Sequence, residues 1–420
     1  MLANLRDRPW LAALLIALIA QALFSLHLGR PSRLVFDEVH YVPAARELLE
    51  LNAPANTEHP LLGKALIASG IALFGDNVVG WRALSTVAGT ATIVGSFAIL
   101  MLLFGSVRTA AFGAVCVLVN QTVFIQARIA MLDGFLGAFV TLALAALIWS
   151  AQAPPGKVWP RLILAAILAG CAVAVKWAAI PYVALTCLGI AWVRLRDGKG
   201  WRTGHAQPHW PGIRTIDAIL AFGLLAVATY LLSFTPAFFY ARDPLTLAEL
   251  IPFQTDMLAS QTQVLQAHTY QSDWWSWPLM LRPIWYFYEP DQGAIRGVLL
   301  VGNPAVMWGG LVAVALCWRA AIAGSGRALL IAGLWTFSVA IFAIIPKSLG
   351  FYYYYHLSGI LIALAIAAAV HRLQDRWPNA DLIFAAAALI LFAYFYPILS
   401  AAPLPSDQAF TVWTWFPSWR

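Results

Sequence analysis

Charged residues are scarce in this 420-residue chain, where Asp, Glu, Lys and Arg together make up 11%. Soluble proteins carry about 25% of such residues. Because 61% of the residues are hydrophobic, too few polar side chains remain to cover a water-facing surface of ordinary size. This shortage excludes an ordinary soluble protein, so a lipid bilayer must act as solvent for most of the chain. The net charge of +7 does not gather in one basic face, which argues against a nucleic-acid partner.

Cysteine is also rare, with four residues in the whole chain. All four lie inside apolar stretches, and their spacing matches neither a metal-binding motif nor a disulfide framework. We therefore interpret them as small buried hydrophobic residues. The four cysteines are Cys116, Cys171, Cys187 and Cys317.

Long apolar runs, in contrast, recur along the chain. A helix needs about 20 apolar residues to span a bilayer. The runs predict an all-α polytopic membrane protein with about eleven transmembrane helices, and we expect one membrane domain over residues 1–420. The first run follows basic residues but is too long for a signal peptide and lacks a cleavage site, so we expect it to be retained. The predicted spans are 10–28, 79–104, 109–127, 132–151, 160–175, 177–194, 215–239, 297–318, 327–345, 351–370 and 380–398.

Two polar loops, 29–78 and 240–296, are long enough to carry a site. The first contains an apolar piece, 61–74, that is too short to span and is expected at the membrane interface. The second is expected to fold against the bilayer surface, because aromatic residues favour the membrane–water boundary. Its tryptophans are Trp274, Trp275, Trp277 and Trp285.

The distribution of basic residues predicts the orientation. With the N-terminus in the cytoplasm, the cytoplasmic segments hold 14 basic and 5 acidic residues, whereas the opposite side holds 12 basic and 14 acidic residues. Cytoplasmic loops are enriched in lysine and arginine. Both long loops and the C-terminal tail are therefore expected outside the cytoplasm.

Ionisable groups at the ends of apolar helices are candidates for function, because charge close to lipid is costly. Asp37 and Glu38 follow the first span directly, and a carboxylate there could serve as a general base. The structural alternative is that Asp37 caps a helix over 42–51 while Glu38 is solvated.

A second cluster contains His59 and Lys64, which could bind a phosphate group. Its structural alternative is a loop that starts an interfacial helix, with the lysine extending toward water. A metal site formed by Asp37, Glu58 and His59 is a further possibility, but the spacing of these residues is not diagnostic. We expect no metal and no cofactor.

Three cations lie where helices meet the outer surface, namely Arg82, Arg128 and Lys176. They suit an anionic lipid headgroup, although interfacial anchoring would also explain them. The second loop adds aromatic and polar side chains typical of a surface that contacts carbohydrate or peptide, and an interfacial aromatic belt is the alternative. The candidates in this loop are His268, Trp275, Trp277, Arg282 and Tyr286.

Several of these pieces, in this order, resemble the protein O-mannosyltransferase family of membrane-embedded glycosyltransferases of the GT-C type. Residues 36–40 resemble the family's FDEVHF motif, 59–64 its HPPLGK motif and 128–133 its RIALLD motif. Further similarity lies in Lys176-Trp177, in 276–286 and in Gly302-Asn303-Pro304, and is looser in 351–356. Leu61 stands where the family often has proline, and the second loop has no room for the lectin-like insert of eukaryotic members. The chain therefore resembles bacterial members.

The resemblance implies an inverting transfer of a sugar, expected to be mannose, from a polyprenyl-phosphate donor to a Ser/Thr hydroxyl of a protein outside the cytoplasm. It implies a multi-pass protein of the plasma (inner) membrane. Asp37 would be the base, Glu38 and His59 would orient it or line the sugar pocket, and Arg82, Arg128 and Lys176 would hold the phosphate. Two alternatives remain open: a GT-C enzyme that glycosylates a lipid, and a transporter of the lipid-linked sugar. A transporter would be expected to show paired halves or broken helices, and the sequence shows neither.

Overall fold

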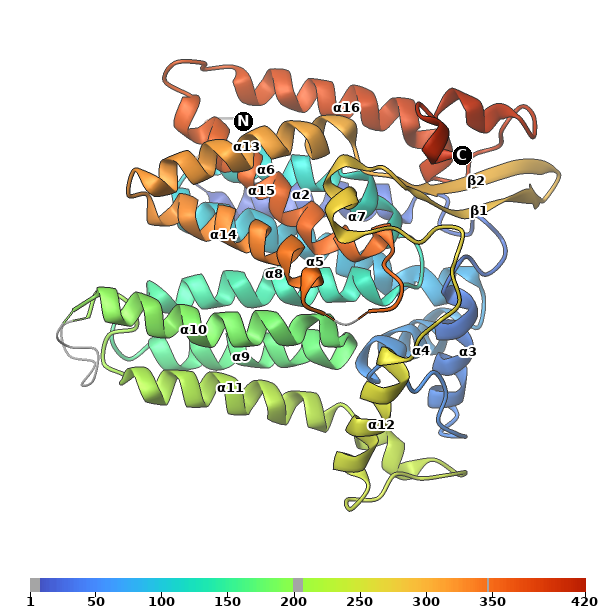
Figure 1. Cartoon of the computed structure of the whole chain (residues 1–420), viewed down its shortest axis with the longest axis horizontal. Coiled ribbons are helices and arrows are strands. Elements are labelled where there is room, and N and C mark those ends of the chain that lie inside the picture. Colours follow the sequence, from blue (N-terminus) through green and yellow to red (C-terminus); the bar gives the residue numbers. More distant parts are fainter. Residues whose placement is uncertain (1–7, 199–206, 346) are drawn as a thin grey trace.

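The computed structural model describes residues 8–198, 207–345 and 347–420. Long helices lie side by side in a bundle, and the short elements gather at one end of it, together with the C-terminus (Figure 1). The fold is therefore mainly helical, with one short β-hairpin, and the predicted polytopic helical architecture is confirmed. The helices are α2 (Pro9–Ser25), α3 (Glu38–Leu49), α4 (Leu62–Phe74), α5 (Val78–Phe104), α6 (Val107–Leu118), α7 (Gln121–Gln126), α8 (Leu132–Ala151), α9 (Val158–Val175), α10 (Ile180–Arg196), α11 (Thr215–Leu232), α12 (Leu250–Thr262), α13 (Pro304–Ile322), α14 (Gly326–Ala340), α15 (His356–Leu373) and α16 (Ala380–Leu399).

Nine helices in the described part of the chain are long and apolar enough to cross a membrane. They correspond to nine of the eleven predicted spans, and the other two correspond to α2 and to the α6–α7 pair. These two are shorter, so the number eleven stays a prediction. The expected cytoplasmic N-terminus includes residues 1–7, which lie outside the described residues.

The span predicted over 109–127 is interrupted at Asn120, which separates α6 from α7. The Asn120 side chain accepts a hydrogen bond from Thr122 N at the start of α7 and donates one to Gly359 O. The break leaves Val119 O without a helical partner, and Asn303 Nδ2 donates to it at 3.1 Å. Composition does not reveal this break, because the run stays apolar on both sides of it. The side-chain amides of Asn120 and Asn303 replace the helical hydrogen bonds that are lost there.

The second long loop is folded, and part of it is a β-hairpin that was not predicted from the sequence. Strands β1 (Ile284–Asp291) and β2 (Ala294–Leu300) pair antiparallel through a turn at Gln292 and Gly293, both with positive φ. The predicted span 297–318 was therefore wrong at its start, because β2 runs to Leu300 and α13 begins at Pro304. The hairpin is joined to the first loop, since Ser32 N donates to the Asp291 carboxylate.

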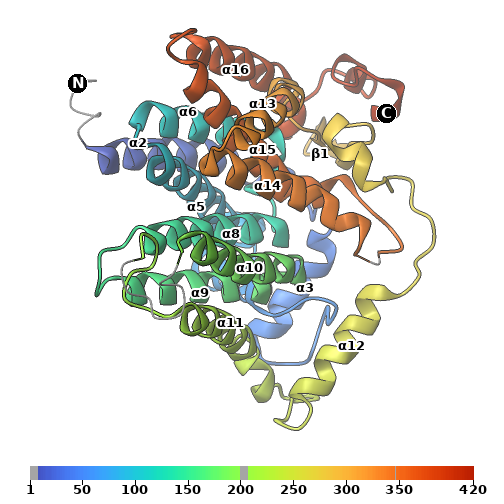
Figure 2. The ribbon, with the colours of Figure 1, turned by 60° about the vertical axis from the view of Figure 1, so that its left-hand side comes forward.

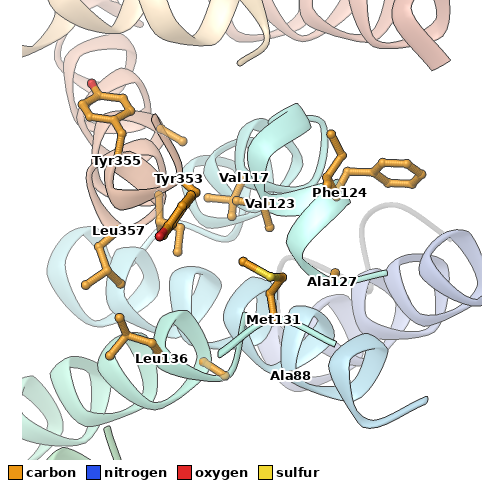
Figure 3. Close-up of a cluster of buried hydrophobic side chains, with 14 of the residues drawn as sticks. Ala88, Val117, Val123, Phe124, Ala127, Met131, Leu136, Tyr353, Tyr355 and Leu357 are labelled. Carbon is orange, nitrogen blue, oxygen red and sulfur yellow. The ribbon is translucent and has the colours of Figure 1, made fainter. Parts of the chain in front are cut away.

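The bundle has two halves that meet along α5 and α8. Helices α8 to α11 lie together on one side, and α13 to α16 lie on the other (Figures 1 and 2). Buried side chains from α5, α6, α7, α15 and the α7–α8 connection fill the core between them (Figure 3). Helix α4 closely approaches α5, because a Cβ on Gly70 would lie 2.4 Å from Gly80 O. The first loop is thereby fixed on the end of the bundle.

Candidate active site

Asp37 lies in the first long loop, at the start of α3. It directly precedes α3, but its side chain makes no capping hydrogen bond to that helix. The cap alternative therefore has no support in the structure. In the described part of the chain the Asp37 carboxylate accepts one hydrogen bond, from Tyr41 Oη at 3.5 Å. Most of its acceptor capacity is thus available to a ligand.

Burial raises the pKa of Asp37 to about 6. Lys176 works against this increase by attraction, whereas the negative charge of Asp133 adds to it. A carboxyl group with a pKa near 6 is mostly ionised at neutral pH and still accepts a proton readily. These are the properties of a general base.

Lys176 and Asp133 form a buried ion pair beside Asp37. Lys176 Nζ lies 3.0 Å from Asp133 Oδ1 and 2.9 Å from Oδ2, and both side chains are nearly buried. The ammonium group also lies over the rings of Tyr353 and Tyr354, 5.1 Å and 5.3 Å from their centroids. Lys176 was predicted as a site residue from the sequence, whereas Asp133 was not. The available signal was an acidic residue in the first turn of an apolar helix.

Aromatic rings form the wall of the site next to Asp37. Phe36, with a φ of 49°, stacks on Tyr286 of β1 with ring centroids 4.3 Å apart. It also meets the edge of Tyr353 at 5.9 Å. Tyr286 Oη accepts a hydrogen bond from Gln126 Nε2 at 3.1 Å. The hairpin therefore places Tyr286 beside the first loop, and its predicted contact with acceptor or sugar stays a prediction.

Glu38 and Arg82 contact each other in the interior. Both side chains are fully buried, and they form a bidentate pair in which Arg82 Nε and Nη2 donate to Glu38 at 2.8 Å and 2.7 Å. Arg82 donates its other N–H groups to the main-chain oxygens of Leu28, Pro31 and Arg33. A guanidinium group has five N–H donors, and five hydrogen bonds are made here. In this structure Arg82 therefore has no N–H donor left for a phosphate, and its phosphate-binding role stays a prediction.

Glu38 was expected to orient the base or to line the sugar pocket, and its contacts support the first of these roles. Its carboxylate also accepts hydrogen bonds from Val35 N and Ala130 N, at 2.8 Å and 2.7 Å. No acceptor position is left for a substrate. Glu38 instead fixes the residues on either side of Asp37 to α5 and to the α7–α8 connection, so it is a positioning residue.

Arg128 and Lys64 were also predicted to bind phosphate, and both donate to main-chain oxygens in this structure, so the two roles stay predictions. Arg128 donates to four main-chain oxygens at the end of α2, from Leu23 to His27, and so terminates that helix. Lys64 Nζ donates to three main-chain oxygens, those of Ala55, Asn56 and His59, and the residue is 1% exposed. An ammonium group has three donors, so Lys64 organises the first loop.

His59 lies beside the site, with its ring edge-on to Tyr41 at 5.9 Å. Burial lowers the pKa of His59 well below its usual value, and the charges of Lys176, Lys64 and Lys347 lower it further. The imidazole is therefore neutral and brings no positive charge to a phosphate. Its Nδ1 is buried without a partner in the described residues, so it remains available to a hydroxyl group of a ligand.

The candidates in the second loop are divided between the interior and the surface. Trp277 is 2% exposed, donates to Ser272 Oγ and packs on Phe342, so it lies in the interior, and its contact with substrate stays a prediction. Arg282 donates to main-chain oxygens of Ser418, Arg420 and Thr269 and thus holds the C-terminal tail.

His268 and Trp275 remain accessible. His268 is exposed and lies edge-on to Phe351 at 5.3 Å. Trp275 is 56% exposed. Both could contact an acceptor, and this role stays a prediction.

No group of three or more His, Cys, Asp or Glu side chains suited to a metal ion occurs among the described residues. Asp37, Glu58 and His59 are thus not gathered into such a cluster. Glu58 accepts a hydrogen bond from Asn56 Nδ2 instead.

Known proteins match this chain in sequence over nearly its whole length. Two family models match: residues 72–241 match dolichyl-phosphate-mannose-protein mannosyltransferase, and residues 246–328 match the C-terminal four-transmembrane region of protein O-mannosyltransferase. A polyprenol-phosphate-mannose–protein mannosyltransferase of Mycobacterium tuberculosis is 27% identical over 99% of this chain and 92% of its own length. Its counterpart in Mycolicibacterium smegmatis is 26% identical over 99% of this chain and 94% of its own length.

Solved structures share the fold at lower identity. The Saccharomyces cerevisiae protein O-mannosyltransferase Pmt1-Pmt2 complex, bound to the sugar donor, superposes with a TM-score of 0.82 at 14% identity and covers 98% of this chain and 92% of its own. ArnT from Cupriavidus metallidurans superposes with a TM-score of 0.58 at 18% identity, covering 88% of this chain and 61% of its own. The expected GT-C fold is confirmed. With the two family models lying in sequence over most of its length, this chain belongs to the protein O-mannosyltransferase family.

Proposed function

We propose that this protein transfers mannose from a polyprenyl-phosphate carrier to a serine or threonine hydroxyl of a protein on the extracytoplasmic side of the plasma membrane. The observation that carries the proposal is the Asp37 carboxylate, largely free of protein hydrogen bonds and close to Lys176. A base and a cation are the two groups that such a transfer needs. The family and its mycobacterial relatives support the substrate class.

In the proposed reaction the acceptor oxygen attacks C1 of the sugar from the face opposite the phosphate. The new C–O bond forms as the bond between C1 and the phosphate oxygen breaks, so the configuration at C1 inverts. Asp37 takes the hydroxyl proton as the nucleophile develops. The electron pair of the broken bond remains on the polyprenyl phosphate, which leaves.

Lys176 is placed to stabilise this leaving group. Two of its three N–H donors are used by Asp133, so the third can reach a phosphate oxygen. Fixed positive charge near a developing negative charge lowers the barrier of a transfer reaction. The carrier-linked sugar is itself the activated substrate, so the reaction as proposed needs neither nucleotide nor metal.

The direct test is a transfer assay with the purified full-length chain. Polyprenyl-phosphate mannose and a Ser/Thr-rich peptide are supplied together, and mass spectrometry follows the peptide. The proposal predicts a gain of one hexose on a hydroxyl side chain. A parallel reaction with a lipid acceptor in place of the peptide decides between the two acceptor classes. Hexose found on the lipid alone would overturn the protein acceptor, and transfer to neither would overturn the activity.

A further inference from the structure

The positive charges near the site differ in how far the protein itself uses them. Arg82, Arg128 and Lys64 donate mainly to main-chain oxygens or, for Arg82, also to a buried carboxylate. Lys176 is neutralised by Asp133. With Asp37 ionised, the centre therefore carries a net negative charge before any donor binds. A phosphodiester adds another negative charge, which requires a further cation.

Lys347 is a cation near this centre with most of its hydrogen-bonding capacity unused. It lies on the connection between α14 and η6 (Tyr352–Tyr355), and its side chain is exposed. Among the described residues, no carboxylate lies within ion-pair distance of it, and its ammonium group makes one long contact, 3.5 Å to Gln261 O. At least two of its three donors are thus open to a ligand.

Hydrogen bonds connect Lys347 to the first loop through Gln261. The main-chain oxygen of Gln261 accepts from Lys347, and its side-chain amide donates to Glu58 O at 2.7 Å, one residue before His59. Six and seven residues after Lys347 come Tyr353 and Tyr354, the rings that Lys176 covers. The charge of Lys347 also acts on His59, and that of Lys176 acts on Lys347, so Lys347 lies near the proposed site.

The segment that carries Lys347 is braced by the second long loop. Ser348 Oγ donates to Gln263 O and accepts from Leu265 N. Gly350 O accepts from Ser272 N at 2.8 Å, and a Cβ on Gly350 would lie 2.5 Å from Ser272 O. These contacts position the lysine independently of its own side chain.

The charge of Lys347 responds to its surroundings. Partial loss of solvent around the ammonium group, together with the positive charge of Lys176, lowers the pKa of Lys347 to about 8. The ammonium form therefore still prevails at neutral pH. A bound anion would stabilise this form, because the repulsion between the two lysines would be offset.

We propose that Lys347, together with Lys176, binds the anionic phosphate of the lipid-linked donor and so takes the place first expected for Arg82. The inference rests on the proposed function for the identity of the donor. The phosphate-binding charge then lies on a connection between helices and not in a helix interior.

The test measures binding of polyprenyl phosphate, without sugar, to the full-length protein in detergent, and measures the KM for the mannose-bearing donor. Lys347→Gln should weaken both by about tenfold or more, as expected when one charge-assisted hydrogen bond is lost. Lys347→Arg should retain most of the affinity. The KM for the peptide acceptor and the thermal unfolding midpoint should stay unchanged. Arg242→Gln is the matched control, because Arg242 is exposed on the same end of the protein.

Binding of the uncharged polyprenyl alcohol should not respond to Lys347→Gln, because that ligand lacks the phosphate. If Lys347→Gln binds the donor as tightly as the wild type does, the inference is overturned. The proposed function still stands in that case, provided that the wild-type enzyme transfers mannose. Loss of polyprenyl-phosphate binding in Lys347→Gln, with no transfer by the wild type, would support the phosphate site and overturn the proposed function. An equal loss of phosphate and alcohol binding would also contradict the inference.

Discussion

Arg82 and Glu38 face each other as two parallel forks, with Nε to Oε1 at 2.8 Å and Nη2 to Oε2 at 2.7 Å, and neither side chain has exposed surface. This pair joins the middle of the first loop to α5. Because Asp37 directly precedes Glu38, the pair determines where the proposed base stands. The adjacent carboxylates thus have separate tasks: one is available for chemistry, and the other fixes its neighbour.

The first prediction concerns this pair. Arg82→Met should destabilise the protein by about 3–5 kcal/mol, because it leaves a buried carboxylate without its cation. The measurement is thermal and denaturant unfolding in detergent. Arg33→Met is the matched control, since Arg33 pairs with Glu289 at the exposed surface, and its effect should stay within about 1 kcal/mol.

The double variant Glu38→Gln/Arg82→Met should recover part of the lost stability, because the uncompensated charge is gone. A stable Arg82→Met protein with weakened donor affinity would contradict this account and return Arg82 to the phosphate.

The contrast between Arg82 and Asp37 shows what the sequence could reveal about the site. Composition was sufficient to predict the polytopic helical fold, because the long apolar runs allow few other structures. Asp37 and Lys176 were named as candidates because ionisable groups at the ends of apolar helices are costly unless used, and the structure brings their charges close together. Whether a buried cation meets a ligand or the protein's own main chain depends on contacts between distant segments. Arg82 reaches main-chain oxygens about 50 residues away, and no local pattern encodes that.

The second prediction is a pH profile. The base must be deprotonated to act, and the pKa of Asp37 is raised to about 6, chiefly by burial. The kcat/KM of the wild type should therefore be level above that pH and fall about tenfold per unit below it.

Asp133→Asn should move this acidic limb to lower pH, because the negative charge of Asp133 helps to raise the pKa of Asp37. The two profiles are compared in the same buffers on folded protein. A limb that stays in place or moves to higher pH in Asp133→Asn would show that another group is titrating.

The third prediction is that chelation leaves transfer intact. Lysine ammonium groups can supply the positive charge that a phosphate leaving group needs. EDTA should therefore change the rate of transfer by less than about twofold. The transfer assay is run with EDTA alone and with added Mg²⁺ or Mn²⁺. Activity that disappears with EDTA and returns with a divalent ion would contradict this prediction.

The fourth prediction concerns topology. In a parent with all four cysteines replaced by alanine, Asn52→Cys and Gln263→Cys should react with an impermeant thiol reagent in intact spheroplasts. Lys157→Cys, on the exposed connection between α8 and α9, should react only after lysis. The reverse pattern would overturn the orientation, which so far depends on the distribution of basic residues.

The β-hairpin and the role of Asp133 were not predicted from the sequence. Residues 284–288 are aromatic and β-branched, as strands often are, but the apolar residues of β2 continue toward α13 and were counted as part of a span. Asp133 was missed because its significance lies in its partner, Lys176, 43 residues away. Both omissions arise where tertiary contacts, and not local pattern, decide the structure.

The central claim is that Asp37 removes the proton from the acceptor hydroxyl, and Asp37→Asn tests it most directly. A positioned general base contributes about 100- to 10,000-fold, and an amide of nearly the same shape cannot accept the proton. Transfer to the peptide should therefore fall by at least about 100-fold, while donor binding and thermal stability stay at the wild-type level. Near-normal transfer by Asp37→Asn, with unchanged binding and stability, would contradict the account and place the base elsewhere.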